Sequence, residues 1–180
     1  TPPTRAIDES VVIDLGGRKA TLLYAGHGNT AGDLALYLPK EKVLATGDII
    51  VAPVPYGFGG YPKDWARVVR QLASLPAATI VPGHGAIMTD ASYLERLAGL
   101  FDHVAEQAAA NKEAASLAID FSADENNFTA GDPVKERLFE MFFKEPIASA
   151  ALNEARGENE KNEPLDGAPA DLCKAANGGE

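Results

Sequence analysis

The feature that most constrains the fold is a change of pattern along the chain. Between Ser10 and Val81, short apolar runs end at glycine, proline or charged residues, which is typical of strands joined by tight turns. From about Asp90 onward, apolar residues recur at helical spacing instead. These patterns predict an α/β fold in which helices flank a mostly antiparallel sheet and the chain ends in helices.

The expected strands are short and closely spaced. Residues 11–15 and 20–24 predict a hairpin, because a Gly-Gly pair lies between them. Further strands are predicted at residues 33–38, 43–46 and 79–81. Residues 52–61, between the last two strands, form a loop rich in proline, glycine and aromatic side chains.

Three amphipathic helices are predicted. The first begins at Pro62, since proline is favoured in a first turn, and the second extends from about Asp90 to about Ala118. The third begins at Asp132-Pro133, after an irregular stretch at residues 119–131. The expected apolar face of the third helix consists of Val134, Leu138, Met141 and Phe142.

Composition and charge narrow the classes of partner. The 180 residues are 46% hydrophobic and 23% charged, which fits a single soluble globular domain. A net charge of -10 disfavours nucleic acids and anionic membrane surfaces as partners. The single cysteine, Cys173, excludes an internal disulfide and is expected to be an inert thiol.

The last 24 residues differ from the rest. Residues 157–180 are polar, acidic and poor in large apolar side chains, so they cannot bury enough surface to offset their ordering entropy. We therefore expect a domain at residues 1–156 followed by a disordered tail. The expected location is a soluble one, the cytoplasm or periplasm of a bacterium.

Three segments place a polar side chain directly after a strand and beside glycine. They are residues 26–33, Thr-Gly-Asp at residues 46–48 and Pro-Gly-His-Gly at residues 82–85. Ligand sites of layered folds gather where loops leave one edge of a sheet, and glycine lets the backbone approach closely there. A carboxylate and an imidazole at such an edge suit a divalent metal such as zinc.

The order and spacing of these segments resemble the C-terminal half of the metallo-β-lactamase superfamily, from about Ile7 to Leu100. The resemblance implies half of a four-layer αββα sandwich. It also implies a metal-dependent hydrolase that holds two ions of zinc or another divalent metal in the intact protein. By the resemblance, Asp48 bridges the ions and orients the nucleophile, and His84 is a ligand of the second ion.

Two departures from the family pattern shape the expectations. The His-x-His-x-Asp-His signature is absent, because the chain has only His27, His84 and His103. We therefore expect a C-terminal fragment whose missing N-terminal half carries the signature. Asn29 stands where the family usually has a ligand histidine, and His27 is the alternative ligand nearby. His103 is expected to be a surface or packing residue.

Two other features bear on the loops. Asp33 is expected to hold its loop in shape by accepting backbone hydrogen bonds rather than by binding metal. Tyr56, Phe58 and Tyr61 are candidates for substrate contacts at the mouth of the site, because the glycines around them leave the loop free to approach a ligand.

The predicted function is hydrolysis of a small-molecule substrate of the ester, thioester, lactone or amide type, with the fragment alone inactive. The alternative is a non-catalytic remnant or a binding module that uses the same fold. If the sheet was built to pack on a missing half, one face should expose apolar side chains. The expected residues are Val12, Leu22, Leu34 and Leu36. We expect this face to bind the missing half or to mediate self-association.

Overall fold

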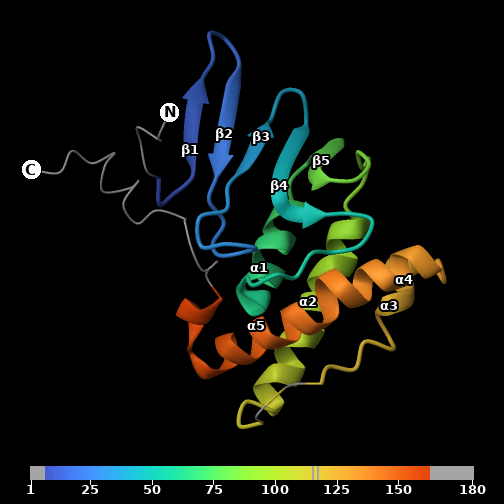
Figure 1. Cartoon of the computed structure of the whole chain (residues 1–180). Coiled ribbons are helices and arrows are strands. Elements are labelled where there is room, and N and C mark those ends of the chain that lie inside the picture. Colours follow the sequence, from blue (N-terminus) through green and yellow to red (C-terminus); the bar gives the residue numbers. More distant parts are fainter. Residues whose placement is uncertain (1–6, 115, 117, 163–180) are drawn as a thin grey trace, which may run out of the picture.

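The fold was analysed on a computed structural model that describes residues 7–114, 116 and 118–162. Five strands form one sheet in the order of the chain (Figure 1). They are β1 (Val11–Asp14), β2 (Lys19–Leu23), β3 (Ala35–Leu38), β4 (Val43–Val51) and β5 (Thr79–His84). Neighbours from β1 to β4 are antiparallel, whereas β4 and β5 are parallel. The predicted α/β class with a mostly antiparallel sheet is therefore confirmed.

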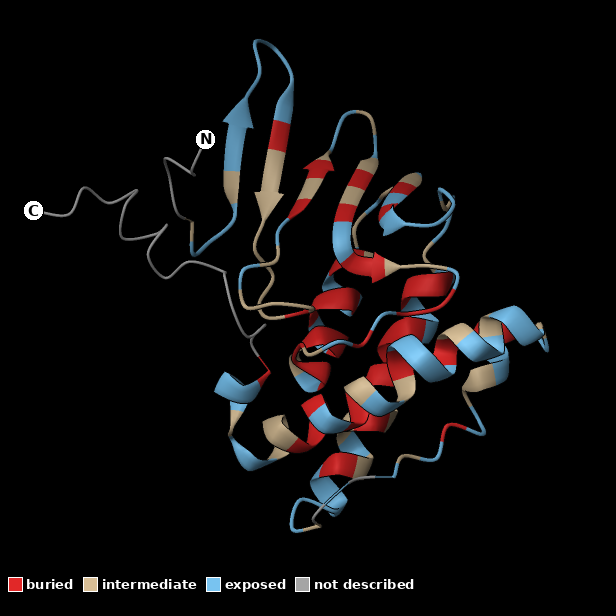
Figure 2. Ribbon diagram, in the orientation of Figure 1, coloured by how far each residue is buried: buried red, intermediate tan, exposed pale blue. Residues whose placement is uncertain are grey.

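Helices follow β4 and β5. The helical elements are α1 (Pro62–Ala73), α2 (Ser92–Ala110), α3 (Glu125–Thr129), α4 (Pro133–Phe139), the π-helix η1 (Glu140–Lys144), α5 (Glu145–Arg156) and the 3-10 helix η2 (Asn159–Lys161). α1 connects β4 to β5 and packs against α2, and α5 packs across both (Figure 1). The buried surface lies mainly where these helices meet each other and β4 (Figure 2).

One face of the sheet is covered by the helices. A row of paired residues on this face runs from Tyr37 through Leu44 to Ile80, and all three are buried. They belong to the same core as Trp65 and Phe101, whose stacked rings lie 4.4 Å apart between α1 and α2. The alternation along each strand therefore directs one set of side chains into the helical core.

The opposite face of the sheet is apolar and only partly buried. Its central row pairs Val11, Leu22, Leu36, Ala45 and Val81 across all five strands. Each of these side chains is half-buried or exposed. The register places Val12 beside Thr21, on the other face, so Val12 does not belong to this row, contrary to the expectation from the sequence. We call this row and the face that it occupies the open sheet face.

Several element boundaries differ from prediction. β5 continues to His84 rather than ending at residue 81. β4 continues past Thr46 to Val51, because a bulge at Gly47 lets the strand bend without ending. Gly47 has a φ of 53°, a conformation that glycine adopts readily. α2 ends at Ala110 rather than near residue 118. The short helix α3 lies in the segment that was predicted to be irregular.

The described structure continues past residue 156 to residue 162. Gly157 ends α5 in a left-handed conformation, and Asn162 is buried. The Asn162 amide donates hydrogen bonds to the carbonyl groups of Gly60 and Ala150, at 2.9 and 2.8 Å. Residues 163–180 of the predicted tail, with Cys173, lie outside the described residues. No helix in the described part of the chain has the length and apolar character needed to cross a membrane.

Candidate metal centre

Asp48 lies in β4 and His84 is the last residue of the parallel strand β5, and their side chains lie close together. The Nε2 atom of His84 is 3.5 Å from Oδ1 of Asp48. The two side chains are 70% and 49% exposed, for His84 and Asp48 respectively, so both remain open to a ligand. The structure thus brings together the two residues that were predicted to bind metal.

Glycines and a buried threonine shape this corner. A Cβ atom at Gly83 would clash with Oδ1 of Asp48 and would lie 2.8 Å from the Asp48 backbone nitrogen. The Thr46 side chain is fully buried, and its hydroxyl donates to the Gly47 carbonyl at 3.1 Å. Beyond the corner, the Ala52 amide donates to the His84 carbonyl at 3.0 Å. Both strands are therefore fixed on either side of the Asp48–His84 pair.

The pair fits two positions around one metal ion. Two donors that each lie about 2.0–2.2 Å from a tetrahedral zinc ion are ~3.4 Å apart, which matches the observed separation. Within residues 7–114, 116 and 118–162, no group of three or more His, Cys, Asp or Glu side chains is placed to hold a metal ion. The described residues would offer such an ion two donors, Asp48 and His84.

His27 is not brought to the Asp48–His84 pair. Its backbone amide donates to Asp64 Oδ2 at 2.8 Å, and its ring packs on Tyr61 with the centroids 4.7 Å apart. These contacts fix the loop against the first turn of α1. The structure therefore gives His27 a packing role there, and it does not supply a third donor for the pair.

Asn29 and Asp33 belong to the same loop. Oδ2 of Asp33 accepts the Thr30 amide at 3.0 Å, and Oδ1 accepts the Thr30 hydroxyl at 2.7 Å. The expectation that Asp33 maintains the loop is confirmed. The Asn29 Oδ1 atom is buried and has no hydrogen-bond partner in the described part of the chain. Asn29 thus has an unsatisfied acceptor at the position where the family usually carries a histidine.

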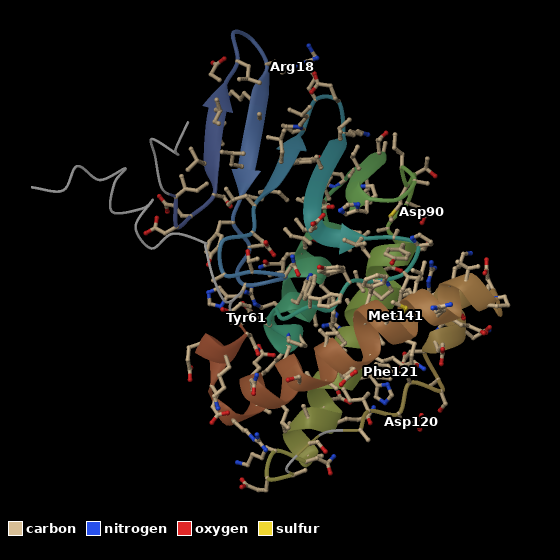
Figure 3. The ribbon with its side chains drawn as sticks, in the orientation of Figure 1. Arg18, Tyr61, Asp90, Asp120, Phe121 and Met141 are labelled. Carbon is tan, nitrogen blue, oxygen red and sulfur yellow. The ribbon has the colours of Figure 1, made fainter. Side chains whose placement is uncertain are left out.

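The three loop aromatics have different surroundings. Tyr56 is 37% exposed and lines a cavity of about 280 Å³ that also includes His84. The Phe58 ring is 4.9 Å from that of Tyr56 and is 48% exposed. Tyr61 is only 4% exposed and lies at the start of α1 (Figure 3). Tyr61 is therefore an interior residue, whereas Tyr56 and Phe58 lie where a substrate can reach them.

His103 has a structural environment. Its Nδ1 atom is 2.6 Å from Asp124 Oδ2, and its Nε2 atom is 2.8 Å from the Gln107 side-chain nitrogen. Gln107 also accepts the Asp120 amide at 2.9 Å. These contacts attach the segment after α2 to the helix itself, as expected for a packing residue.

The sequence did not predict that residues of the C-terminal helices line the cavity beside His84. Phe142 was expected to face the core, but it is 37% exposed and lines the cavity beside His84 together with Leu138. The π-helix η1 explains the difference, because its wider turn displaces the residues that follow from simple helical spacing. Phe139, which also fits an apolar helix face and is expected in the core, is fully buried, as is Phe143.

The comparisons with known proteins agree with this architecture. The sequence model of the metallo-beta-lactamase superfamily matches residues 2–84, a range that includes both Asp48 and His84. A solved metallo-beta-lactamase family protein from Thermus thermophilus is 21% identical with a TM-score of 0.55, and the match covers 84% of this chain and 49% of that one. A metallo-beta-lactamase from Pontibacter korlensis is 25% identical with a TM-score of 0.47, covering 53% of this chain and 47% of that one. The comparison with curated proteins found no match.

The fold, a five-stranded sheet whose parallel pair ends at a carboxylate and an imidazole, is that of a metallo-β-lactamase-like half-sandwich. The sequence match over residues 2–84 supports membership of the metallo-beta-lactamase superfamily. It spans about half the length of the solved relatives that it matches.

Proposed function

We propose that this chain contributes the Asp48–His84 donor pair to a metal-dependent hydrolase acting on a small molecule with an ester, thioester, lactone or amide-type bond. The observation that carries the proposal is the 3.5 Å separation of the Asp48 carboxylate and the His84 imidazole at an open corner of the sheet. The net charge of -10 favours a small-molecule substrate over a nucleic acid.

A divalent metal held there would lower the pKa of a bound water molecule and polarise the substrate carbonyl. In hydrolysis, the water oxygen bonds to the carbonyl carbon, the bond to the leaving group breaks, and the leaving group acquires a proton. Asp48 can accept a hydrogen bond from the attacking water through its second carboxylate oxygen, Oδ2, and so orient it. His84 would serve as a neutral nitrogen ligand through Nε2.

Full activity requires more donors than these two. A catalytic zinc site generally has three protein ligands and a water, and two ions would need more. We propose that the further ligands come from a segment bearing the His-x-His-x-Asp-His signature, which the present sequence lacks. On this proposal, residues 1–180 alone bind zinc weakly and turn over little substrate.

Isothermal titration calorimetry of the 180-residue chain with zinc chloride tests the donor pair. We expect weak binding by the parent chain and at least a tenfold loss in both Asp48→Asn and His84→Gln. Asp8→Asn is the matched control, because Asp8 is an exposed aspartate and should leave binding unchanged. His27→Gln should also leave it unchanged.

Zinc affinity that is the same in the parent, Asp48→Asn and His84→Gln would contradict the proposal and favour a non-catalytic binding module. Turnover of a thioester or a chromogenic β-lactam by the parent chain alone would refute the requirement for a further segment. Mixing the chain with a separately produced segment that carries the signature should raise turnover in the parent but not in Asp48→Asn.

A further inference from the structure

The cavity beside His84 is walled almost entirely by apolar side chains. It has a volume of about 280 Å³ and lies between the segment after β4 and the helices α4 and η1. Its lining consists of Val51, Ala52, Pro53, Val54, Pro55, Tyr56, His84, Leu138 and Phe142. His84 and the Tyr56 hydroxyl are the polar side-chain groups among these residues. Such a lining favours an apolar occupant, because a buried polar group would lose its water without gaining partners.

A hydrogen bond attaches the helical side of the cavity to the loop. The Gly57 amide donates to the Phe142 carbonyl at 2.9 Å, which joins the loop to the π-helix η1. A Cβ atom at Gly57 would lie 3.0 Å from the Phe143 ring, so glycine leaves room for this close approach. The Phe58 ring lies 5.8 Å from that of Phe142 and extends the aromatic surface. The cavity is thus formed by contacts within the fold. Figure 3 labels Met141, the residue that precedes Phe142 in η1.

The size of the cavity limits what it can hold. Small-molecule pockets begin at roughly 300 Å³, so this cavity suits one part of a ligand rather than a whole drug-sized molecule. A single aromatic ring or a short branched alkyl chain fits that space. Because His84 forms part of the wall, the ring or chain lies next to the position of the scissile bond in the proposed hydrolase.

We propose that this cavity is the specificity pocket of the site and that it selects substrates carrying an aryl or short branched alkyl group next to the scissile carbonyl. The inference rests on the proposed function for its link to catalysis. Leu138 and Phe142 are the specificity-determining residues, since they supply the part of the apolar lining that comes from the C-terminal helices. Polar or very small acyl groups would leave this wall hydrated and bind less tightly.

Chemical-shift titration by NMR of the 180-residue chain, without metal, tests the pocket directly. The probes are N-methylphenylacetamide and, as the small matched probe, N-methylacetamide. We expect the phenyl probe to bind at least tenfold more tightly. It should shift the amide signals of Val54, Leu138 and Phe142 and the imidazole signal of His84. Equal binding of the two probes, or shifts confined to other regions, would overturn the proposal.

Two variants test the named wall. Phe142→Ser should weaken the phenyl probe at least tenfold, whereas Met141→Ser should change its binding less than twofold. Met141 is the matched control, because it lies on the same helical segment, is 51% exposed and does not line the cavity. If Phe142→Ser does not fold, Leu138→Trp fills the cavity and should abolish the preference for the phenyl probe. Equal effects of the Phe142 and Met141 variants, or full binding by folded Leu138→Trp, would also overturn it.

The zinc titration separates this proposal from the proposed function. Failure of zinc to bind, with the phenyl preference retained, would refute the hydrolase and support the pocket as an apolar binding site. Zinc binding through Asp48 and His84 without any phenyl preference would support the hydrolase and refute the specificity pocket.

Discussion

Gly83 lies directly against the carboxylate of Asp48. A Cβ atom at position 83 would overlap Asp48 Oδ1 and would lie 2.7 Å from the carbonyl carbon of Gly47. The glycine before His84 therefore does more than allow a turn. It lets the end of β5 approach β4 closely enough for the carboxylate and the imidazole to converge.

Replacing Gly83 with alanine should displace the Asp48 carboxylate and reduce zinc affinity at least tenfold. The calorimetric titration described above measures the loss. Gly99→Ala is the control, because Gly99 lies in α2 with no atom within 4 Å of a built Cβ. That control should keep zinc affinity and stabilise the helix by roughly 0.5–1 kcal/mol. Unchanged zinc binding in Gly83→Ala would contradict the role given to this contact.

Tyr93 predicts an alkaline loss of stability. Burial raises the pKa of the Tyr93 phenol, and Arg96 opposes the shift only in part. A group whose pKa is raised by folding contributes stability below its unfolded value, about 10 for tyrosine, and loses it as the pH rises further. The free energy of unfolding should therefore fall above about pH 10, as urea denaturation at several pH values will show.

Tyr93→Phe should remove that part of the alkaline slope. It should also cost about 1 kcal/mol at neutral pH, because the Tyr93 hydroxyl donates to the Val51 carbonyl at 2.7 Å. Tyr56→Phe, at an exposed tyrosine, is the matched control and should leave the slope as in the parent. An identical slope in the parent and Tyr93→Phe would count against the assignment.

Glu154 should be the residue that caps α1. No side-chain cap comes from Tyr61, and Glu154 of α5 accepts the amides of Lys63 and Asp64 instead, at 2.8 and 3.4 Å. Glu154→Ala should lower the free energy of unfolding by about 1 kcal/mol in urea denaturation. Glu145→Ala, at an exposed position of the same helix, should have little effect.

Glu154→Gln should cost less than the alanine variant. Burial raises the pKa of the Glu154 carboxyl, so its charge is costly to bury, and the neutral amide keeps one acceptor for the helix. A glutamine variant that is less stable than the alanine variant would show that the negative charge itself stabilises the helix terminus.

The open sheet face should mediate self-association of the isolated chain. Apolar residues line up across all five strands there, and water is a poor environment for such a face. Size-exclusion chromatography with light scattering should give a mass above 18.9 kDa for the parent chain. Leu22→Glu should shift the chain toward the monomer. Val12→Glu should not, because Val12 lies on the opposite face of the sheet. A parent chain that is entirely monomeric would rule out this prediction.

Local patterns predicted the helix α1, and the resemblance to the metallo-β-lactamase superfamily implied that Asp48 and His84 lie together. Pro62 and the apolar spacing that begins at Trp65 mark the helix, and a helix between two strands favours a parallel pair. Asp48 lies within β4 and His84 is the last residue of β5, so the pairing of these two strands brings the donors together. The extension of β4 to Val51 was missed, because Gly47 looks like a turn when it is in fact a bulge.

The C-terminal helices could not be predicted in the same way. Phe142 is 37% exposed, although it fits a helical apolar face. A π-helix cannot be recognised from spacing, because its extra residue per turn is stabilised by contacts made elsewhere. The position of Tyr61 also depends on a contact between segments that are distant in the sequence. Its amide donates to the Gly28 carbonyl at 2.9 Å.

Because β4, α1 and β5 form one continuous segment, residues 43–84, the backbones at Asp48 and His84 can separate only if β5 detaches from β4. That detachment would expose Leu44 and Ile80, which are among the most deeply buried residues of the core. The donor pair should thus open in the same cooperative event as the core, and the amides of this segment should be among the slowest to exchange with deuterium. A metal ion bound at the pair would then slow exchange throughout the domain and not only in the loops around it.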